Sequence, residues 1–189
     1  MVGRFAGGMP PSVSREVRHR VEVNMGFDLN AFLGRVSELR TWKDHLPSVV
    51  VCELSGDLGL VPVTRKLFEE LRARLGKEEA NRLDAAQSHP GYPSPSHNEG
   101  VRRWGLQASK GTAIAYQSMG EFGDQGYDEA IIWSDGREVL SVLSAGSFRV
   151  LAHFREQAGF NLGDKPIDLE QHRGEDAAEK WAAAASRQC

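Results

Sequence analysis

Alternation of apolar and polar positions predicts β-strands in the first third of the chain. Between positions 27 and 33, apolar residues recur at every second position, which is typical of a strand with one buried face. Apolar runs follow at 48–54 and 58–63, and the turn Ser55-Gly56-Asp57 between them indicates a hairpin. Because Pro62 cannot donate a backbone hydrogen bond, we expect the second run to leave the sheet there or to lie at its edge.

The second half of the chain predicts three more strands. Apolar residues dominate 112–119 and 127–133, and a glycine-rich connection separates these two runs. A third run, 138–143, follows Asp135-Gly136, a dipeptide that tolerates the positive φ values of a type I′ turn. Hairpins of this kind join neighbouring antiparallel strands, so the pattern favours an antiparallel sheet.

Helical periodicity is clearest after Thr64, which suits an N-cap. Leu67, Phe68, Leu71 and Leu75 share one face of the following segment, and charged residues occupy the other face. This segment is therefore predicted to be an amphipathic helix that packs on the sheet.

Weaker signals predict four further helical segments. The stretches 37–46 and 147–159 each open on a serine that can serve as an N-cap, and a third helix is predicted at 77–87. The last, 175–187, is rich in alanine but has only Trp181 as an apolar anchor, so it is marginal unless it docks.

The order of these elements predicts an α+β fold, with a mainly antiparallel sheet and helices packed on one face. We expect a single domain at 25–162. Residues 1–24 contain several glycines and prolines and read as a flexible leader. Residues 163–189 are mostly polar and are predicted to be a tail that carries the marginal helix.

Composition narrows the possible partners. The 189 residues carry a formal net charge of -3, which gives no general attraction to nucleic acid or to an anionic membrane. No apolar run is long enough to span a bilayer. Of the two cysteines, Cys52 lies in an apolar run and Cys189 is the last residue, so no disulfide framework is predicted. These features favour a cytoplasmic protein whose partner is another protein or a small molecule.

Motifs that would indicate catalysis or a cofactor are absent from the sequence. His89 and His97 lie eight positions apart on a proline-rich loop, without the closer pairing typical of zinc sites. Gly120, Gly123 and Gly126 join two predicted strands, whereas a dinucleotide-binding loop leads into a helix. No G-x-S-x-G motif marks a nucleophile. We therefore expect no metal and no cofactor.

The glycine-rich connection is the strongest candidate for a binding surface. It combines aromatic side chains with acidic and polar ones, which is the composition of an interface anchor with a polar rim. The predicted partner-binding residues are Glu121, Phe122, Asp124, Gln125 and Tyr127.

Two resemblances point in the same direction. Positions 113–136 and 60–67 resemble a family of small, uncharacterised bacterial proteins, and this likeness brings no catalytic residues. It is carried by Leu60-Val61-Pro62-Val63-Thr64, Leu67, Ala115-Tyr116, Glu121-Phe122-Gly123, Gly126, Ala130-Ile131-Ile132-Trp133 and Asp135-Gly136. The strand pair around 127–133 and the helix start Ser147-Phe148 resemble SMI1/KNR4-type domains, α+β modules of which many are immunity proteins against bacterial toxins.

The leading hypothesis is therefore a non-enzymatic protein-binding module, in its most specific form an immunity-like inhibitor of a bacterial toxin. The alternative is an enzyme or a domain that binds a small ligand or a metal through the acidic loop 120–129, aided by His89 or His97. A homo-oligomer formed through the edge near Pro62 or through Trp181 is a third possibility.

Overall fold

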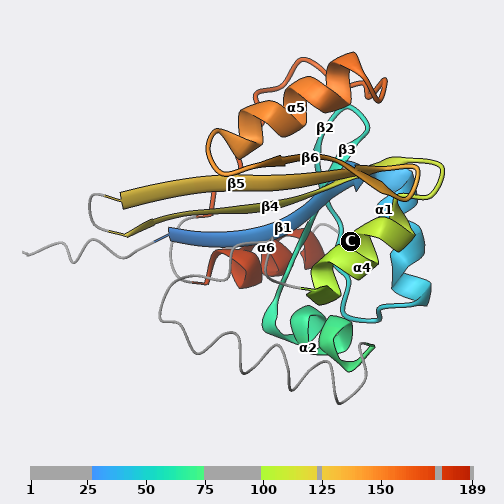
Figure 1. Cartoon of the computed structure of the whole chain (residues 1–189). Coiled ribbons are helices and arrows are strands. Elements are labelled where there is room, and N and C mark those ends of the chain that lie inside the picture. Colours follow the sequence, from blue (N-terminus) through green and yellow to red (C-terminus); the bar gives the residue numbers. More distant parts are fainter. Residues whose placement is uncertain (1–26, 75–98, 123–124, 173–175, 188–189) are drawn as a thin grey trace, which may run out of the picture.

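A six-stranded sheet forms the centre of the molecule. The computed structural model describes residues 27–74, 99–122, 125–172 and 176–187 (Figure 1). Neighbouring strands run antiparallel in the order β2-β3-β1-β4-β5-β6. The strands are β1 (Phe27–Arg35), β2 (Cys52–Ser55), β3 (Leu58–Pro62), β4 (Ala113–Phe122), β5 (Gln125–Ser134) and β6 (Arg137–Val142).

Helices connect or flank these strands, so the expected α+β class with an antiparallel sheet is confirmed. They are α1 (Val36–Thr41) with a following 3-10 turn (Trp42–Asp44), α2 (Arg65–Ala73), α4 (Glu99–Ala108), α5 (Gly146–Glu156) and α6 (Ala177–Ser186). Among the described residues, no helix combines the length and the apolar character that crossing a bilayer requires.

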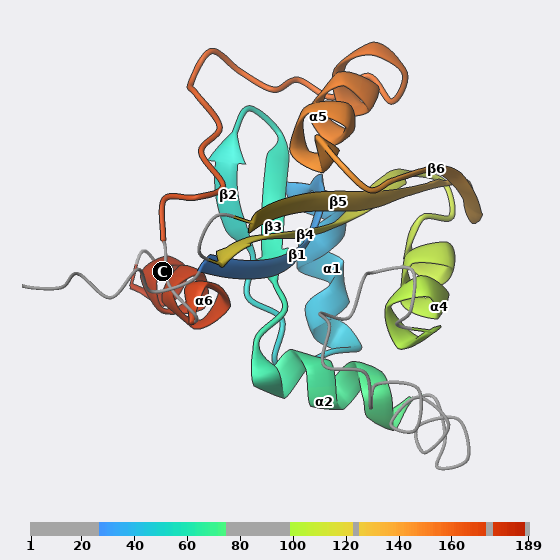
Figure 2. The ribbon, with the colours of Figure 1, turned by 60° about the vertical axis from the view of Figure 1, so that its left-hand side comes forward.

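The helices cover both faces of the sheet, not one face as the sequence suggested. Figure 2 shows α5 above the sheet and α2 below it. Two separate apolar clusters correspond to these two layers: one packs α5 and α6 on the sheet, and the other packs α1, α2 and α4. The central strands supply apolar side chains to both, because neighbouring residues such as Ile131 and Ile132 point to opposite faces.

Helix α6 belongs to the core, although its sequence was expected to lie in a tail beyond residue 162. Ala177 and Trp181 are 0% and 5% exposed, and the helix contacts β1, β2 and β3. The thiol of Cys52, itself buried, donates to the backbone oxygen of Trp181 at 3.5 Å. Docking of a few small and aromatic residues thus stabilises a helix whose own periodicity is weak.

Helix α4 was not predicted from the sequence. Its buried apolar side chains in the core, Val101 and Trp104, are few, and Gly105 is a poor helix former. The glycine has a packing role, because a Cβ at this position would lie 2.4 Å from Cε3 of Trp133. The helix therefore approaches β5 closely enough to cover that indole ring, which is 0% exposed.

Local turn and cap signals were read correctly in two places. The side chain of Thr64 accepts the backbone N–H of Leu67 at 3.3 Å and caps α2. Asp135 and Gly136 have φ values of 51° and 73° and join β5 to β6. By contrast, Ser37 lies inside α1, whose N-cap is Arg35.

The two surfaces suggested for self-association are buried within the chain. Pro62 ends β3, a strand that lies between β2 and β1 and is buried along its whole length. Trp181 is buried beneath α6. Neither residue can serve as an exposed contact between copies of this chain. The expected leader, 1–24, lies outside the described residues.

Candidate functional site

A groove lies where the β4–β5 hairpin meets the start of α5. Its volume is about 610 Å³ and it opens to solvent. Both strands of the hairpin, the segment that links β6 to α5, and Glu170 contribute to it. The lining residues are Met119, Gly120, Glu121, Gly126, Tyr127, Asp128, Leu143, Ser144, Ala145, Ser147, Phe148 and Glu170.

The hairpin extends further than its glycines suggested. β4 and β5 pair without interruption from Ala113 opposite Ser134 to Phe122 opposite Gln125. Gly120 and Gly126 therefore lie within the ladder, not in a loop between two shorter strands. Gly126 lies on the α5 face, two positions before Asp128, so its lack of a side chain leaves open space beside α5. Gly120 faces the other way, between Asp28 and Tyr127.

Asp128 fixes the start of α5 on the sheet. Its Oδ1 and Oδ2 accept the backbone N–H of Ser147 at 3.0 and 3.1 Å, and Oδ1 also accepts the Ser147 hydroxyl at 3.0 Å. The Gln117 side chain donates a further hydrogen bond to the same oxygen. A carboxylate at this position also interacts favourably with the positive end of the helix dipole.

Close backbone packing accompanies this cap. A Cβ added to Gly146 would lie 2.7 Å from the carbonyl carbon of Glu129, so the first residue of α5 rests directly on β5. Ala145 precedes it with φ 55°, a left-handed conformation that turns the chain from β6 into the helix. Ser147, which the sequence suggested as the N-cap, is the second residue of α5 and is capped by Asp128.

Two large apolar side chains are exposed at this groove. Leu143 and Phe148 are each 71% exposed, and both line it. They flank the left-handed turn at Ala145, so their positions follow from the way α5 is fixed to β5. Val139 of β6 is also exposed, at 48%, but does not line the groove.

Three acidic residues line the groove. Among the described lining residues, Glu121, Asp128 and Glu170 contribute carboxylates. Asp128 is already hydrogen-bonded to α5, whereas Glu121 is exposed. Leu169, next to Glu170, is 5% exposed and packs in the core, which fixes the backbone at that wall.

The structure brings two of the five predicted binding residues to the groove. Both Glu121 and Tyr127 line it, but only the Glu121 side chain is on its face of the sheet. The side chain of Tyr127 is half-buried on the opposite face, where its hydroxyl bonds Asp28. Phe122 and Gln125 pair through their backbones at the tip of the hairpin, and their side chains lie outside the described part of the structure. Asp124 also lies outside the described residues.

Sequence reasoning missed Leu143 and Phe148. Both were assigned to a strand or to the face of a helix, and an apolar residue in either place is usually buried. Their exposure depends on where β6 ends and on how α5 is attached, which no local pattern reveals. The role of Asp128 was missed for a similar reason, since its partner Ser147 is nineteen positions away.

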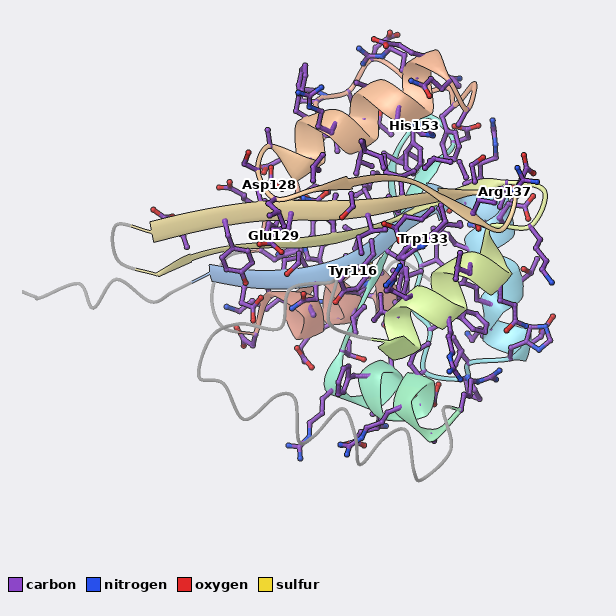
Figure 3. The ribbon with its side chains drawn as sticks, in the orientation of Figure 1. Tyr116, Asp128, Glu129, Trp133, Arg137 and His153 are labelled. Atoms are coloured by element: carbon purple, nitrogen blue, oxygen red, sulfur yellow. The ribbon has the colours of Figure 1, made fainter. Side chains whose placement is uncertain are left out.

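The opposite face of the same three strands carries a separate polar network. Tyr127 donates its hydroxyl to Oδ1 of Asp28 at 2.9 Å, reaching across Gly120, which lies between them in the sheet. Asn30 donates to the same Asp28 oxygen at 3.1 Å and accepts the Tyr116 hydroxyl at 3.1 Å. Figure 3 shows Asp128 on the α5 side of the sheet, and Glu129 and Tyr116 on the other side.

Burial raises the pKa values of two groups in this network. Desolvation raises the pKa of Asp28 above its ordinary value of 3.8, although hydrogen bonds from Tyr127 and Asn30 act in the opposite direction. Burial also raises the pKa of Tyr116, and the negative charge of Asp28 adds to the effect. Tyr116 therefore remains a neutral donor at any physiological pH.

The described acidic residues of 120–129 do not converge on one site. Glu121 and Asp128 lie on the α5 side, whereas Glu129 lies on the face of Tyr116, where its Oε2 is buried without a hydrogen-bond partner. Within the described ranges, no group of three or more histidine, cysteine or acidic side chains could hold a metal ion. His89 and His97 lie outside those ranges.

Comparison with known proteins gives no further guide to this site. Neither a scan against models of protein families nor searches of curated proteins and of solved structures found a match to this chain. The likeness to a bacterial family and to SMI1/KNR4-type domains stays a prediction from the sequence.

Replacement of Asp128 tests its role as the anchor of α5. We expect Asp128→Ala to lower the free energy of unfolding by about 1–3 kcal/mol, because the partly buried hydrogen bonds from Ser147 and Gln117 lose their acceptor. Glu121→Ala removes an exposed carboxylate from the same groove and should change stability by less than about 0.5 kcal/mol. Urea unfolding of both variants provides the comparison, and equal effects would show that Asp128 is not an anchor.

The raised pKa of Asp28 predicts a pH-dependent stability. Because the folded chain binds this proton more tightly than the unfolded chain, the stabilisation is present below pH 3.8 and is lost as pH rises through the raised pKa. In urea titrations, Asp28→Asn should therefore gain stability relative to the wild type over that window and keep a constant advantage above it. Asp164→Asn, at an exposed site, controls for the change of charge. If the stability of Asp28→Asn instead falls relative to the wild type as pH rises through this window, the raised pKa of Asp28 is contradicted.

Proposed function

We propose that this chain is a non-enzymatic protein-binding module whose partner occupies the groove between the β4–β5 hairpin and α5. The exposure of Leu143 and Phe148 in that groove carries the proposal. Water in contact with two large apolar side chains is released when a partner covers them, and this release favours association. Aromatic anchors surrounded by polar groups are typical of the centre of protein interfaces.

The way the groove is built supports binding without large rearrangement. The cap at Asp128 and the contact of Gly146 with β5 hold Phe148 in a fixed position relative to the hairpin. A site that is already ordered loses less conformational entropy when it binds. The same rigidity leaves Asp128 engaged with α5, so this carboxylate is a poor candidate for acid–base chemistry.

The more specific form of the proposal is an immunity-like inhibitor. It predicts a single dominant partner, a toxin made by the same organism, whose activity falls as the chain is added until the two are equimolar. A partner that is not a toxin would remove the immunity role but would leave the binding role intact.

A double substitution in the groove tests the binding role. We expect Leu143→Ser with Phe148→Ser to reduce recovery of the partner by at least about tenfold, which corresponds to a loss of about 1.4 kcal/mol or more. The measurement is affinity capture from the cells that make the protein, with quantitative mass spectrometry. Val139→Ser is the matched control, because it also removes an exposed apolar side chain but lies outside the groove.

Both variants must retain the fold for this comparison, and melting curves check it. All three side chains are exposed, so their replacement should change stability by less than about 0.5 kcal/mol. Equal capture by the double variant and the wild type would contradict the proposal, as would loss of capture with Val139→Ser alone.

A further inference from the structure

We infer that the partner adds an extended segment to the open edge of β6, where it becomes a further strand of the sheet and then enters the groove. This inference rests on the proposed function, since it names how a partner binds beside Leu143 and Phe148. It follows from the unpaired backbone of β6 and from the continuity of this strand with the groove.

The outer side of β6 is open to solvent. β6 is the last strand in the order of the sheet and pairs with β5 alone. Arg137, Glu138, Val139 and Ser141 are exposed, and among the described residues no backbone hydrogen bond joins them to a group outside the β5–β6 ladder. Unpaired N–H and C=O groups along a sheet edge form a template for another strand.

The register of the β5–β6 hairpin shows which backbone groups point outward. The two-residue turn at Asp135-Gly136 is closed by a hydrogen-bonded pair, Ser134 and Arg137. Hydrogen-bonded and non-hydrogen-bonded pairs alternate along an antiparallel ladder. Glu138 is therefore in a non-hydrogen-bonded pair, and its N–H and C=O point away from β5.

A β-bulge interrupts this alternation at Val139, which has no partner in the register. Leu140 follows in a hydrogen-bonded pair with Ile132, and Ser141 is then in a non-hydrogen-bonded pair. The N–H and C=O of Ser141 therefore point away from β5 toward solvent. The regular part of the edge begins after the bulge and runs to the end of β6.

This part of the edge leads directly into the groove. β6 ends at Val142, and the next three residues, 143–145, all line the groove. A segment that pairs with Ser141 therefore runs on past the end of β6 and meets Leu143 and Phe148. Apolar residues at every second position of the segment can cover these two side chains, because alternate side chains of a strand share a face.

The opposite edge of the sheet is less open. Cys52 and Ser55 of β2 are 4% and 6% exposed, and β2 contacts α6. The turn after β2 lies against the segment 161–163, where the backbone N–H of Asp57 donates to the oxygen of Asn161 at 2.8 Å. Of the two edge strands, β6 is therefore the one that offers a surface for a further strand.

A segment of another protein fits this edge better than a second copy of β6. A two-fold pair centred on Ser141 would place the bulge at Val139 of each copy opposite Leu143 of the other. Since a bulge bends its strand and disrupts the ladder, both ends of this short pairing would be irregular. A segment without a bulge can follow β6 past Ser141 and continue into the groove.

Peptides selected for binding to the full chain test this inference. Phage-displayed random peptides are selected on the immobilised chain, and the variant Leu143→Ser with Phe148→Ser removes those that bind elsewhere. Synthetic copies should bind Ser141→Pro at least about tenfold more weakly than the wild type, because proline has no N–H and its ring projects toward the added strand. Ser141→Ala keeps the N–H and should bind within about twofold of the wild type.

The fold of both variants is checked by melting curves. The N–H of Ser141 is not bonded to β5, so proline at this position removes no hydrogen bond of the sheet. If Ser141→Pro nevertheless fails to fold, the wild-type chain and modified peptides decide the question.

N-methylation of the peptides reads out the added strand from the side of the ligand. Alternate amides of such a strand point toward β6 and away from it. Methylation of one alternate set should abolish binding, whereas methylation of the other set should weaken it far less.

Hydrogen exchange reads out the same contact from the side of the chain. Exchange of the Ser141 amide should be fast in the free chain and should slow when a peptide binds. The amide of Val142, which the register directs toward β5, should be protected in both states and is the control.

The outcomes separate this inference from the proposed function. Peptides that need Leu143 and Phe148 but leave exchange at Ser141 unchanged, or that tolerate methylation of both sets, would overturn the added strand and leave the binding role standing. Equal binding to folded Ser141→Pro and Ser141→Ala would do the same. A dimer of the free chain in sedimentation that Ser141→Pro dissociates would assign the edge to a second copy and overturn the inference. Peptides that bind the double variant as tightly as the wild type, or a selection that enriches nothing on the wild type, would overturn both.

Discussion

The attachment of α5 to β5 is the interaction on which the rest of the site depends. Gly146 rests on the backbone of β5, and the carboxylate of Asp128 holds the N–H and the hydroxyl of Ser147. Once the helix start is fixed, Val150 and Phe154 enter the core while Phe148 stays in solvent. The same attachment forces the left-handed turn at Ala145.

Helices cover both faces of the sheet, and the groove lies at the end of the β4–β5 hairpin. α5 and α6 bury one face and α1, α2 and α4 bury the other. Among the described residues, the apolar clusters end at Met119 on β4 and at Ala130 on β5. There the polar network around Asp28 occupies one face, and the groove occupies the other. In the described part of the chain, the core is thus buried between two layers of helices, and the groove lies at one end of three long strands.

Local chemistry made part of this structure readable from the sequence. The cap at Thr64 and the turn at Asp135-Gly136 involve only residues three or four positions apart in the sequence, so both could be predicted. The alternation at 27–33 also gave β1 correctly. Glu121 was placed in the candidate site because acidic and aromatic residues cluster there, whereas the side chain of Tyr127 from the same cluster lies on the opposite face of the sheet.

Features that depend on distant contacts could not be read in the same way. α4 forms because Gly105 can approach Trp133, and α6 is stable because Trp181 reaches the core beside Cys52. The exposure of Leu143 and Phe148 depends on the Asp128 cap, whose two partners are far apart in the chain. A one-sided arrangement of helices was expected because hairpins suggest one solvated face, yet β5 carries apolar residues on both.

Site-specific photo-crosslinking in the cells that make the protein tests most directly whether a partner occupies the groove. A photoreactive phenylalanine analogue at position 148 probes the groove, and the same analogue at position 156 probes the exposed far end of α5. A discrete crosslinked protein from position 148 that is absent from position 156 is the expected result. The same products from both positions, or none from position 148, would contradict a partner-binding role for this groove.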